Sequence, residues 1–307
     1  LVVTKETMQK KEYSVEVGGK TLTAEFNDWA NQANGSVLVR YGNSAVLATA
    51  VMSAKESNLD YFPLSVEYEE KFYATGAILG SRFMRREGRP SDEAVLSGRI
   101  VDRTIRPLFP KGLKRDVQVM VTVLSLEDYD TDILAVNAAS LALATSDIPW
   151  NGPVSAVRIG IPGDGEELVV NPSYGQRSDE LPPKAKLDLT VSGKDGMVNM
   201  IEVNAREVSE DVLTAALAGA VKEIEKIQTW QKQIVAERAV AKATFIAPFE
   251  DDAKLAPAFE EIVGTELAAM NGRITKKNLG KFKTNWSAHA ALTFPDVPAG
   301  VIDTYYE

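Results

Sequence analysis

The chain has 307 residues, of which 45% are hydrophobic and 25% charged, and its formal net charge is −9. These values are typical of a globular protein, and the length predicts about two domains. Cysteine is absent and histidine occurs only as His289, which excludes disulfides, thiolate catalysis and Cys-based zinc sites and argues against a histidine triad. Apolar runs stay below the roughly 18 residues of a membrane helix and the N-terminus lacks the apolar core of a signal peptide, so we expect a cytoplasmic protein.

The N-terminal part of the chain is predicted to be a series of β-strands. Apolar and polar residues alternate on both sides of Gly18 and Gly19, and again on both sides of Gly42 and Asn43, which predicts two hairpins. A fifth strand precedes a basic stretch. The predicted strands cover residues 13–17, 21–26, 37–41, 45–52 and 64–68.

Residues 82–115, RFMRREGRPSDEAVLSGRIVDRTIRPLFPKGLKR, form a basic stretch in an acidic chain. The stretch holds ten Lys and Arg against four Asp and Glu, and eight of the fourteen arginines of the chain. A local charge that opposes the net charge is costly by self-repulsion unless it faces an anion or internal carboxylates. Because the guanidinium fork binds phosphate oxygens in pairs, the choice of arginine favours phosphate recognition.

The basic stretch is predicted to consist of a loop and a helix. Glycines and Pro90 interrupt the sequence before Ser91, so the first four arginines are placed on a loop. Ser91 is predicted to be the N-cap of a helix that Pro107 ends, and Asp102 can pair with an arginine four residues later. Three arginines at i, i+4 and i+7 share one face of this helix: Arg99, Arg103 and Arg106. The loop favours an anion site, whereas the helix fits a solvated ion-pair face equally well.

The rest of the chain repeats the order of strands followed by a helix. An interior strand and an Ala-rich buried helix come first, followed by four more strands and a long helix capped by Ser209. Strands followed by helices, twice, predict an α+β fold with helices packed on mixed sheets. The predicted strands cover residues 117–126, 154–161, 167–170, 187–191 and 198–203, and the two helices begin at residues 132 and 209.

Two domains follow from this pattern. Residues 1–235 are predicted to form one core of two related halves, 1–148 and 149–235. The composition changes near residue 245, and residues 240–307 are predicted to form a small all-helical linker domain. His289, in the segment SAHAAL, is expected to be a helix residue without a chemical role.

Three segments carry a family resemblance: YEEKFYATGAILGS, FMRREGRPSDEAVLSGRIVDRTIRPLFPKG and DIPWNGPVSAVRIG. They resemble the first ribonuclease PH-like core of the bacterial polynucleotide phosphorylases, and the likeness runs from about residue 13 through the helix at Ser209. The last part of the chain is similar to the helical linker of that family only in position and type. The resemblance implies a ribonuclease PH-like core, whose halves are of the ribosomal protein S5 domain 2-like type, followed by an all-α domain.

The resemblance also implies a function. Proteins of this family are phosphorolytic 3′-to-5′ exoribonucleases that use inorganic phosphate and Mg²⁺ to release nucleoside diphosphates from RNA. They form rings of three chains with two related cores each, thread single-stranded RNA through a central channel, and can join RNA-degradation complexes. The residues that match the family's channel motif, which usually reads FFRR, are Phe83, Arg85, Arg86 and Arg89. Met84 replaces the second aromatic residue here, and Arg82 is an additional residue.

The resemblance places no catalytic or metal-binding residue in this chain. In the family the chemistry belongs to the second core, where a Gly-Ser-Ser-Ser loop holds phosphate and two aspartates and a lysine serve the metal and the leaving group. The matching segment here, LEDYDTDILAVNAAS, offers carboxylates in place of phosphate donors. Asp188 in KLDLTV matches one aspartate, but Thr190 replaces the lysine, so we expect Asp188 to be structural and to have no companion carboxylate.

Two interpretations of the chain stay open at this point. In the first, it guides RNA in an active phosphorolytic enzyme whose chemistry lies in a second core. In the second, it is a non-catalytic RNA-binding and ring-assembly module. The two are distinguished by whether the gene continues past Glu307 into another arginine loop and a serine-rich phosphate loop.

Overall fold

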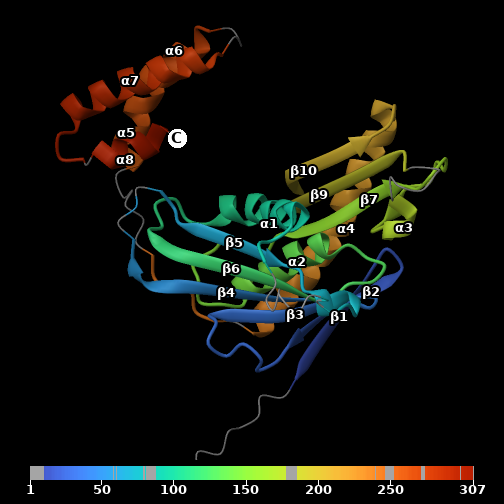
Figure 1. Cartoon of the computed structure of the whole chain (residues 1–307). Helices are drawn as coiled ribbons and strands as arrows, with labels where there is room; N and C mark the ends of the chain where they lie inside the picture. The colour runs from blue at the N-terminus through green and yellow to red at the C-terminus, as the bar shows by residue number, and fades with distance from the viewer. Residues whose placement is uncertain are drawn as a thin grey trace, which may run out of the picture. The chain divides into compact units, whose positions relative to one another are not determined.

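A break between residues 244 and 245 divides the chain into two units, and residues 111–113 are grouped with the second unit. The computed structural model (Figure 1) describes residues 10–57, 59, 61–78, 80, 88–177, 185–238, 240–245, 252–270, 274–297 and 299–306. The first unit contains all of the strands that the structure describes, and the second unit is helical. The assignment of residues 1–235 to one core with halves that meet near residue 148 stays a prediction.

The first unit contains a six-stranded sheet with the strand order β1-β2-β3-β4-β6-β5. Neighbouring strands are antiparallel except β5 and β6, which are parallel, so the chain between them must cross over. Gly18, Gly19 and Gly42 have φ values of 57°, 76° and 59°, which confirms both predicted hairpin turns. The strands are β1 (Lys11–Val17), β2 (Lys20–Phe26), β3 (Gly35–Tyr41), β4 (Ser44–Glu56), β5 (Leu64–Glu69) and β6 (Arg115–Ser125).

A second sheet of four antiparallel strands has the order β10-β9-β7-β8. Its strands are β7 (Ser155–Ile161), β8 (Val169–Val170), β9 (Leu187–Lys194) and β10 (Met197–Ala205), and the short helix α3 (Tyr174–Arg177) lies between β8 and β9 in the chain. With the longer helices that are described next, strands followed by helices occur twice along the chain. This order confirms the α+β prediction.

Three longer helices pack on these sheets. Helix α2 (Thr131–Ala144) contacts β3, β4 and β7, so it lies between the two sheets, and every one of its residues is buried. This burial explains why apolar residues occur on every side of this helix. Helix α1 (Asp92–Ile105) packs against α2 and β5, and α4 (Glu210–Glu237) packs against β7 and β9.

In the first unit, side chains form hydrogen bonds with backbone groups at N-terminal and at C-terminal ends of helices. Ser91 Oγ accepts the backbone N–H of Ala94 at 3.0 Å, and Ser209 Oγ accepts that of Val212 at 3.4 Å, which confirms both predicted N-caps. At the C-terminal end of α2, Lys242 Nζ donates to the carbonyl oxygens of Leu143, Ala144 and Ser146 at 2.9, 3.1 and 2.7 Å. An ammonium at this position stabilises carbonyls that have no partner within the helix.

The remaining single turns of this unit are η1 (Phe72–Thr75) and η2 (Arg106–Leu108).

The second unit has its own hydrophobic core around Trp286. The Nε1 of Trp286 donates to the carbonyl of Ile302 at 2.8 Å, and the ring of Phe259 packs edge-on against the indole at 5.0 Å between centroids. The helices are α5 (Asp252–Phe259), the π-turn η3 (Glu260–Gly264), α6 (Thr265–Ala268), α7 (Lys276–Thr293) and α8 (Ala299–Tyr306). Within the described ranges, no helix is both long enough and apolar enough to cross a bilayer.

Candidate functional site

The three arginines of the basic helix have different surroundings. Arg106 binds Asp102, with Nη2 to Oδ1 at 2.7 Å, and also donates to the carbonyl of Leu64 at 3.2 Å. These two contacts connect β5 with α1. The first contact confirms the predicted Asp102–Arg106 pair. Arg103 lies 3.7 Å from Glu202, but both side chains are more than half exposed, so the pair contributes little. Arg99 is exposed and forms no ion pair with a residue that the structure describes.

Of the predicted loop residues, Arg89 lies in the described part of the chain, whereas Phe83, Arg85 and Arg86 fall outside it. Arg89 is exposed and, like Arg99, has no ion pair within the described ranges. It lines a hollow of about 530 Å³ at the start of α1. Arg99 lines a hollow of about 420 Å³, and the two hollows share Pro90 and three other lining residues. The structure therefore brings two available guanidinium groups to neighbouring hollows.

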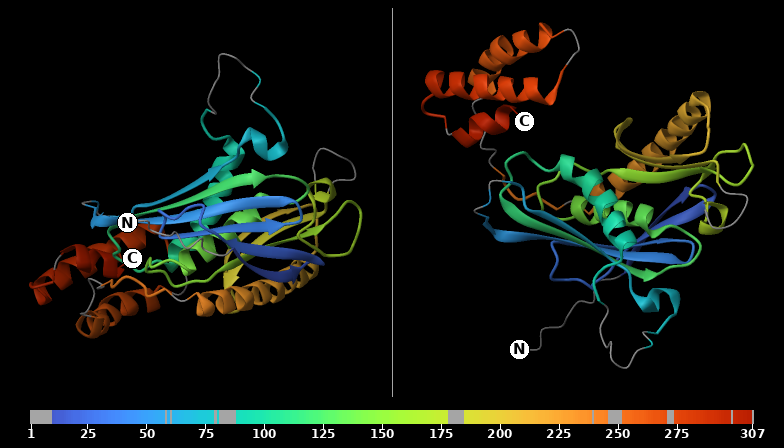
Figure 2. Two further views of the ribbon diagram at one scale, coloured as in Figure 1. Left: turned by 90° about the horizontal axis from the view of Figure 1, so that it is seen from below. Right: turned by 45° about the horizontal axis from the view of Figure 1, so that its top comes forward.

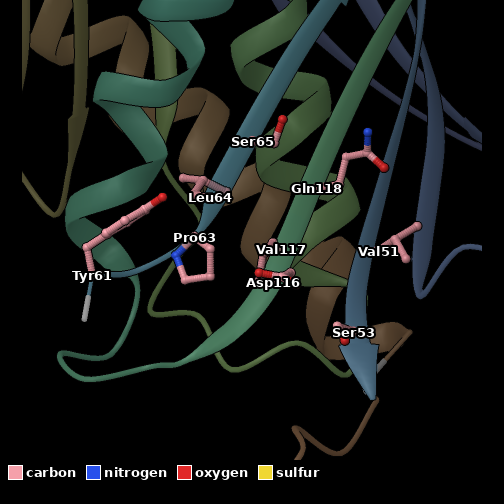
Figure 3. A pocket seen from close by; sticks show the side chains of 9 residues that line it. All are labelled: Val51, Ser53, Tyr61, Pro63, Leu64, Ser65, Asp116, Val117 and Gln118. Carbon is pink, nitrogen blue, oxygen red and sulfur yellow. The ribbon is translucent and has the colours of Figure 1, made fainter. Parts of the chain in front are cut away.

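A third hollow, of about 450 Å³, lies on strands β4, β5 and β6 and in the segment before β5 (Figure 3). It is lined by Val51, Ser53, Tyr61, Pro63, Leu64, Ser65, Asp116, Val117 and Gln118. None of these nine residues is cationic, and Asp116 adds negative charge. This hollow does not suit phosphate groups, so it is not the anion site.

A buried ion network lies where the start of α2 meets β7 and β9. Arg158 on β7 binds Asp130 at 3.0 Å, Asp132 at 2.7 Å and Asp188 at 2.7 Å. Arg177 also binds Asp130, and it reaches Asp188 at 3.5 Å. All five side chains are at most 20% exposed. Three carboxylates and two guanidinium groups thus lie together in one largely buried site.

The prediction that Asp188 has no companion carboxylate is wrong. Strand β7 pairs with β9 so that Arg158 lies opposite Thr190, diagonally next to Asp188 on the same sheet. The same guanidinium reaches the acidic N-terminus of α2, and it joins carboxylates that lie far apart in the sequence. Both oxygens of Asp188 are bound by arginines.

The two acids at the start of α2 respond differently to this environment. Burial and the negative charge of Asp130 raise the pKa of Asp132 to about 7. Burial acts on Asp130 in the same direction, but Arg158 and Arg177 outweigh it and hold the pKa of Asp130 below its usual value. Oδ1 of Asp132 accepts no hydrogen bond from the described residues. The pKa of Asp132 is therefore shifted well above that of an ordinary aspartate, whereas the pKa of Asp130 is shifted the other way.

This network does not fit phosphate or a divalent metal ion. The guanidinium groups already face carboxylates, and the space beside Asp130 and Arg158 is only about 10 Å³, close to the roughly 10–15 Å³ that one water molecule needs. The carboxylate oxygens point at Arg158 and Arg177, whose charges repel a cation. Over the described ranges, no group of His, Asp and Glu side chains could hold a metal ion. Mg²⁺ therefore has no fitting donor set here.

Sequence reasoning missed Arg158 and Arg177. The available signal was the strand SAVRIGI, in which Arg158 is the one charged residue among seven buried ones. A charge in a buried strand requires partners of opposite sign, because an isolated buried ion is strongly disfavoured. The acidic segment around Asp130 supplies those partners.

Comparison with known proteins gives a family match for part of the chain. Residues 18–149 match the 3′ exoribonuclease family, domain 1. The polyribonucleotide nucleotidyltransferase of Halothermothrix orenii is 48% identical over 236 residues, which cover 76% of this chain and 32% of that protein. The protein of the same name from Thermus thermophilus is 45% identical over 241 residues, which cover 78% of this chain and 33% of that protein. The one from Macrococcus caseolyticus is 44% identical over 257 residues, which cover 83% of this chain and 35% of that protein. The chain thus spans about a third of the length of these relatives.

Comparison with a solved structure supports the fold class. The crystal structure of rice (Oryza sativa) Rrp46 is similar with a TM-score of 0.52 at 13% identity, covering 75% of this chain and 96% of that one. At this identity the likeness shows the fold alone, and it confirms the predicted ribonuclease PH-like class. Residues 18–149 thus match domain 1 of the 3′ exoribonuclease family, and the core is similar to the corresponding third of the polyribonucleotide nucleotidyltransferases. The predicted resemblance is confirmed.

Proposed function

We propose that this chain guides RNA in a phosphorolytic 3′-to-5′ exoribonuclease, a polyribonucleotide nucleotidyltransferase that releases nucleoside diphosphates with inorganic phosphate. The supporting observation is the 44–48% identity to proteins of that name over at least 76% of the chain. The chemistry and its Mg²⁺ are assigned to a second core outside this sequence. The assembly is a homotrimeric ring in the cytoplasm that takes single-stranded RNA and can join an RNA-degradation complex.

The closed ion network supports the assignment of guidance to this chain and chemistry to another core. Phosphoryl transfer depends on donors aimed at the reacting phosphate, and the Nη groups of Arg158 and Arg177 are already bound by carboxylates. RNA contacts are assigned to the basic stretch: Phe83, Arg85, Arg86, Arg89, Arg99, Arg103 and Arg106. Among these, Arg89 and Arg99 reach phosphate without giving up a described partner, and Arg103 can exchange its exposed Glu202. Arg106 acts chiefly by holding β5 beside α1.

Activity of the chain alone tests this division of labour. With poly(A), phosphate and Mg²⁺, the 307-residue chain is expected to bind RNA and to release no nucleoside diphosphate. Turnover close to that of a full-length relative would place chemistry in this chain and refute the assignment. The alternative, a non-catalytic RNA-binding and ring-assembly module, is favoured by the same closed network and predicts no phosphorolysis by the full-length protein either.

The salt dependence of RNA binding tests the arginine assignments. Removing one phosphate-binding cation from a single-strand site lowers the slope of log K against log salt by about 0.7, so Arg89→Ala with Arg99→Ala should lower it by about 1.4. Arg85→Ala with Arg86→Ala should do the same, whereas Phe83→Ala should weaken binding by about 1–3 kcal/mol with little change in slope. Lys222→Ala, an exposed cation on α4, is the matched control. Unchanged affinity together with a lower melting temperature would make these arginines structural.

A further inference from the structure

A turn with two exposed aromatic rings follows strand β5. In η1, Phe72 is 48% and Tyr73 is 55% exposed, whereas the next residue, Ala74, is buried. Both views of Figure 2 show this segment, in cyan, at the periphery of the first unit. A ligand that covers one of these rings removes apolar surface from water, which favours its binding.

Hydrogen bonds fix the geometry of this turn. The N–H of Gly76 donates to the carbonyl of Tyr73 and that of Ala77 to the carbonyl of Phe72, both at 3.0 Å. Leu126 N–H donates to the carbonyl of Ala74 at 2.9 Å and so ties the turn to the end of β6. Gly76 closes the turn in the left-handed region, at φ 71°, which favours glycine. A ligand at this turn therefore does not have to order the backbone, which lowers the cost of binding.

Phe72 lines the same hollow of about 530 Å³ as Arg89. The volume lies within the roughly 300–1,000 Å³ that is common for small-ligand sites. Ala74, Ala94 and Leu126 contribute apolar surface to it. Tyr73 does not line the hollow, although it is the neighbouring residue on the turn.

The charges around this hollow leave one cation available. Lys71 pairs with Glu69 at 2.9 Å, and Glu70 accepts a hydrogen bond from Ser91 Oγ at 3.0 Å. Arg89 has no ion pair with another described residue. An aromatic ring and one available guanidinium on one hollow suit a ligand that joins an aromatic ring to a single anionic group. The two carboxylates disfavour a ligand with several phosphates.

We propose that this hollow is a subsite for one nucleotide of single-stranded RNA, with the base stacked on Phe72 and a phosphate at Arg89. Stacking on an aromatic side chain beside a cation is how proteins bind single strands without reading the sequence. The subsite rests on the proposed function and extends it, because Phe72 lies outside the arginine-rich loop and helix. The competing occupant of the hollow is a side chain of a protein partner.

Fluorescence anisotropy with short labelled oligo(A) tests the subsite on the full chain. Phe72→Ala should weaken binding by roughly 5- to 150-fold without changing the salt slope, and Phe72→Trp should retain binding. Tyr73→Ala, which removes the ring next to the hollow, is the matched control and should bind like the parent. Arg89→Ala should lower the salt slope by about 0.7. An oligonucleotide containing 2-aminopurine should be quenched by the parent and less by Phe72→Ala.

The outcomes separate this inference from the proposed function. If the parent binds RNA and Phe72→Ala binds equally well, the subsite is refuted and the proposed function stands. If the parent binds no RNA, the proposed function falls and the subsite falls with it. Equal loss in Phe72→Ala and Tyr73→Ala would refute a specific stacking position. Unchanged RNA affinity with a changed sedimentation coefficient in Phe72→Ala would assign the hollow to a protein contact.

Discussion

Asp132→Asn is expected to change how the free energy of unfolding depends on pH. In the folded chain, burial and the charge of Asp130 raise the pKa of Asp132 from 3.8 to about 7. A carboxyl group whose folded pKa is raised takes up a proton on folding. Its contribution to stability is therefore fully present below the unfolded pKa and is lost as the pH rises through the folded value. The window for Asp132 runs from about pH 4 to about pH 7.

The magnitude follows from the size of this shift. Asparagine cannot ionise, and it keeps an oxygen for the 2.7 Å contact with Nη2 of Arg158. Relative to the parent, the variant should gain stability as the pH rises, by at most about 1.4 kcal/mol per pH unit within the window. The ceiling is about 4 kcal/mol over the whole window. Asp130, whose pKa is lowered chiefly by Arg158 and Arg177 against its burial, adds stability in both proteins that is lost as the pH falls.

Urea unfolding followed by circular dichroism between about pH 5 and pH 8 measures this difference. Asp116→Asn, which removes an exposed carboxylate on β6, is the matched control for the loss of one acidic group. The stability difference between Asp132→Asn and the parent should grow with pH by more than the difference for the control. A constant difference, or one that shrinks with rising pH, would show that Asp132 is ionised and neutralised by Arg158 throughout.

Three further substitutions have expected effects on stability. Lys242→Met leaves the carbonyls at the end of α2 without their ammonium and should cost about 1–3 kcal/mol in urea unfolding, whereas a loss within error would show that water replaces it. Ser91→Ala removes the N-cap of α1 and should cost about 1 kcal/mol, with Ser91→Thr, which keeps the hydroxyl that also donates to Glu70, retaining most of the stability; equal losses would argue against capping. Trp286→Phe removes the donor to the carbonyl of Ile302 and should lower the stability of the second unit by about 1 kcal/mol or more, measured by differential scanning calorimetry. A shift confined to the transition of the first unit would contradict the last expectation.

The parts of the fold that could be predicted depend on local signals. The two N-terminal hairpins follow from alternation around Gly18 and Gly42, whose positive φ values the turns require. Helices α1 and α4 begin where Ser91 and Ser209 supply a side-chain acceptor for backbone N–H groups. Each of these signals lies within a few residues of the feature that it specifies, so the sequence was sufficient.

The ion network could not be predicted from such signals. Its members come from α2, β7, α3 and β9, and they meet because of the register between β7 and β9 and the position of α2 between the sheets. Neither the register between β7 and β9 nor the position of α2 is specified by the residues next to Arg158 or Asp188 in the sequence. The parallel pairing of β5 with β6 is likewise a property of the whole sheet. Read alone, the acidic segment at 127–132 indicates only that an anion is disfavoured there. The cations that make it stable in the interior come from distant parts of the chain.

Arginine alone does not mark the functional site of this protein, because the carboxylates within its reach decide what it does. The Nη groups of Arg158 and Arg177 are bound by three aspartates in a buried site, so these two arginines pair with internal carboxylates in place of an external phosphate. Arg106 has Asp102 one helical turn away and serves the packing of β5. Arg89 and Arg99 have no such partner in the described part of the chain, and both line open hollows. The excess of positive charge in the basic stretch is therefore available to an external anion at those two positions, and RNA guidance by this chain should depend on them.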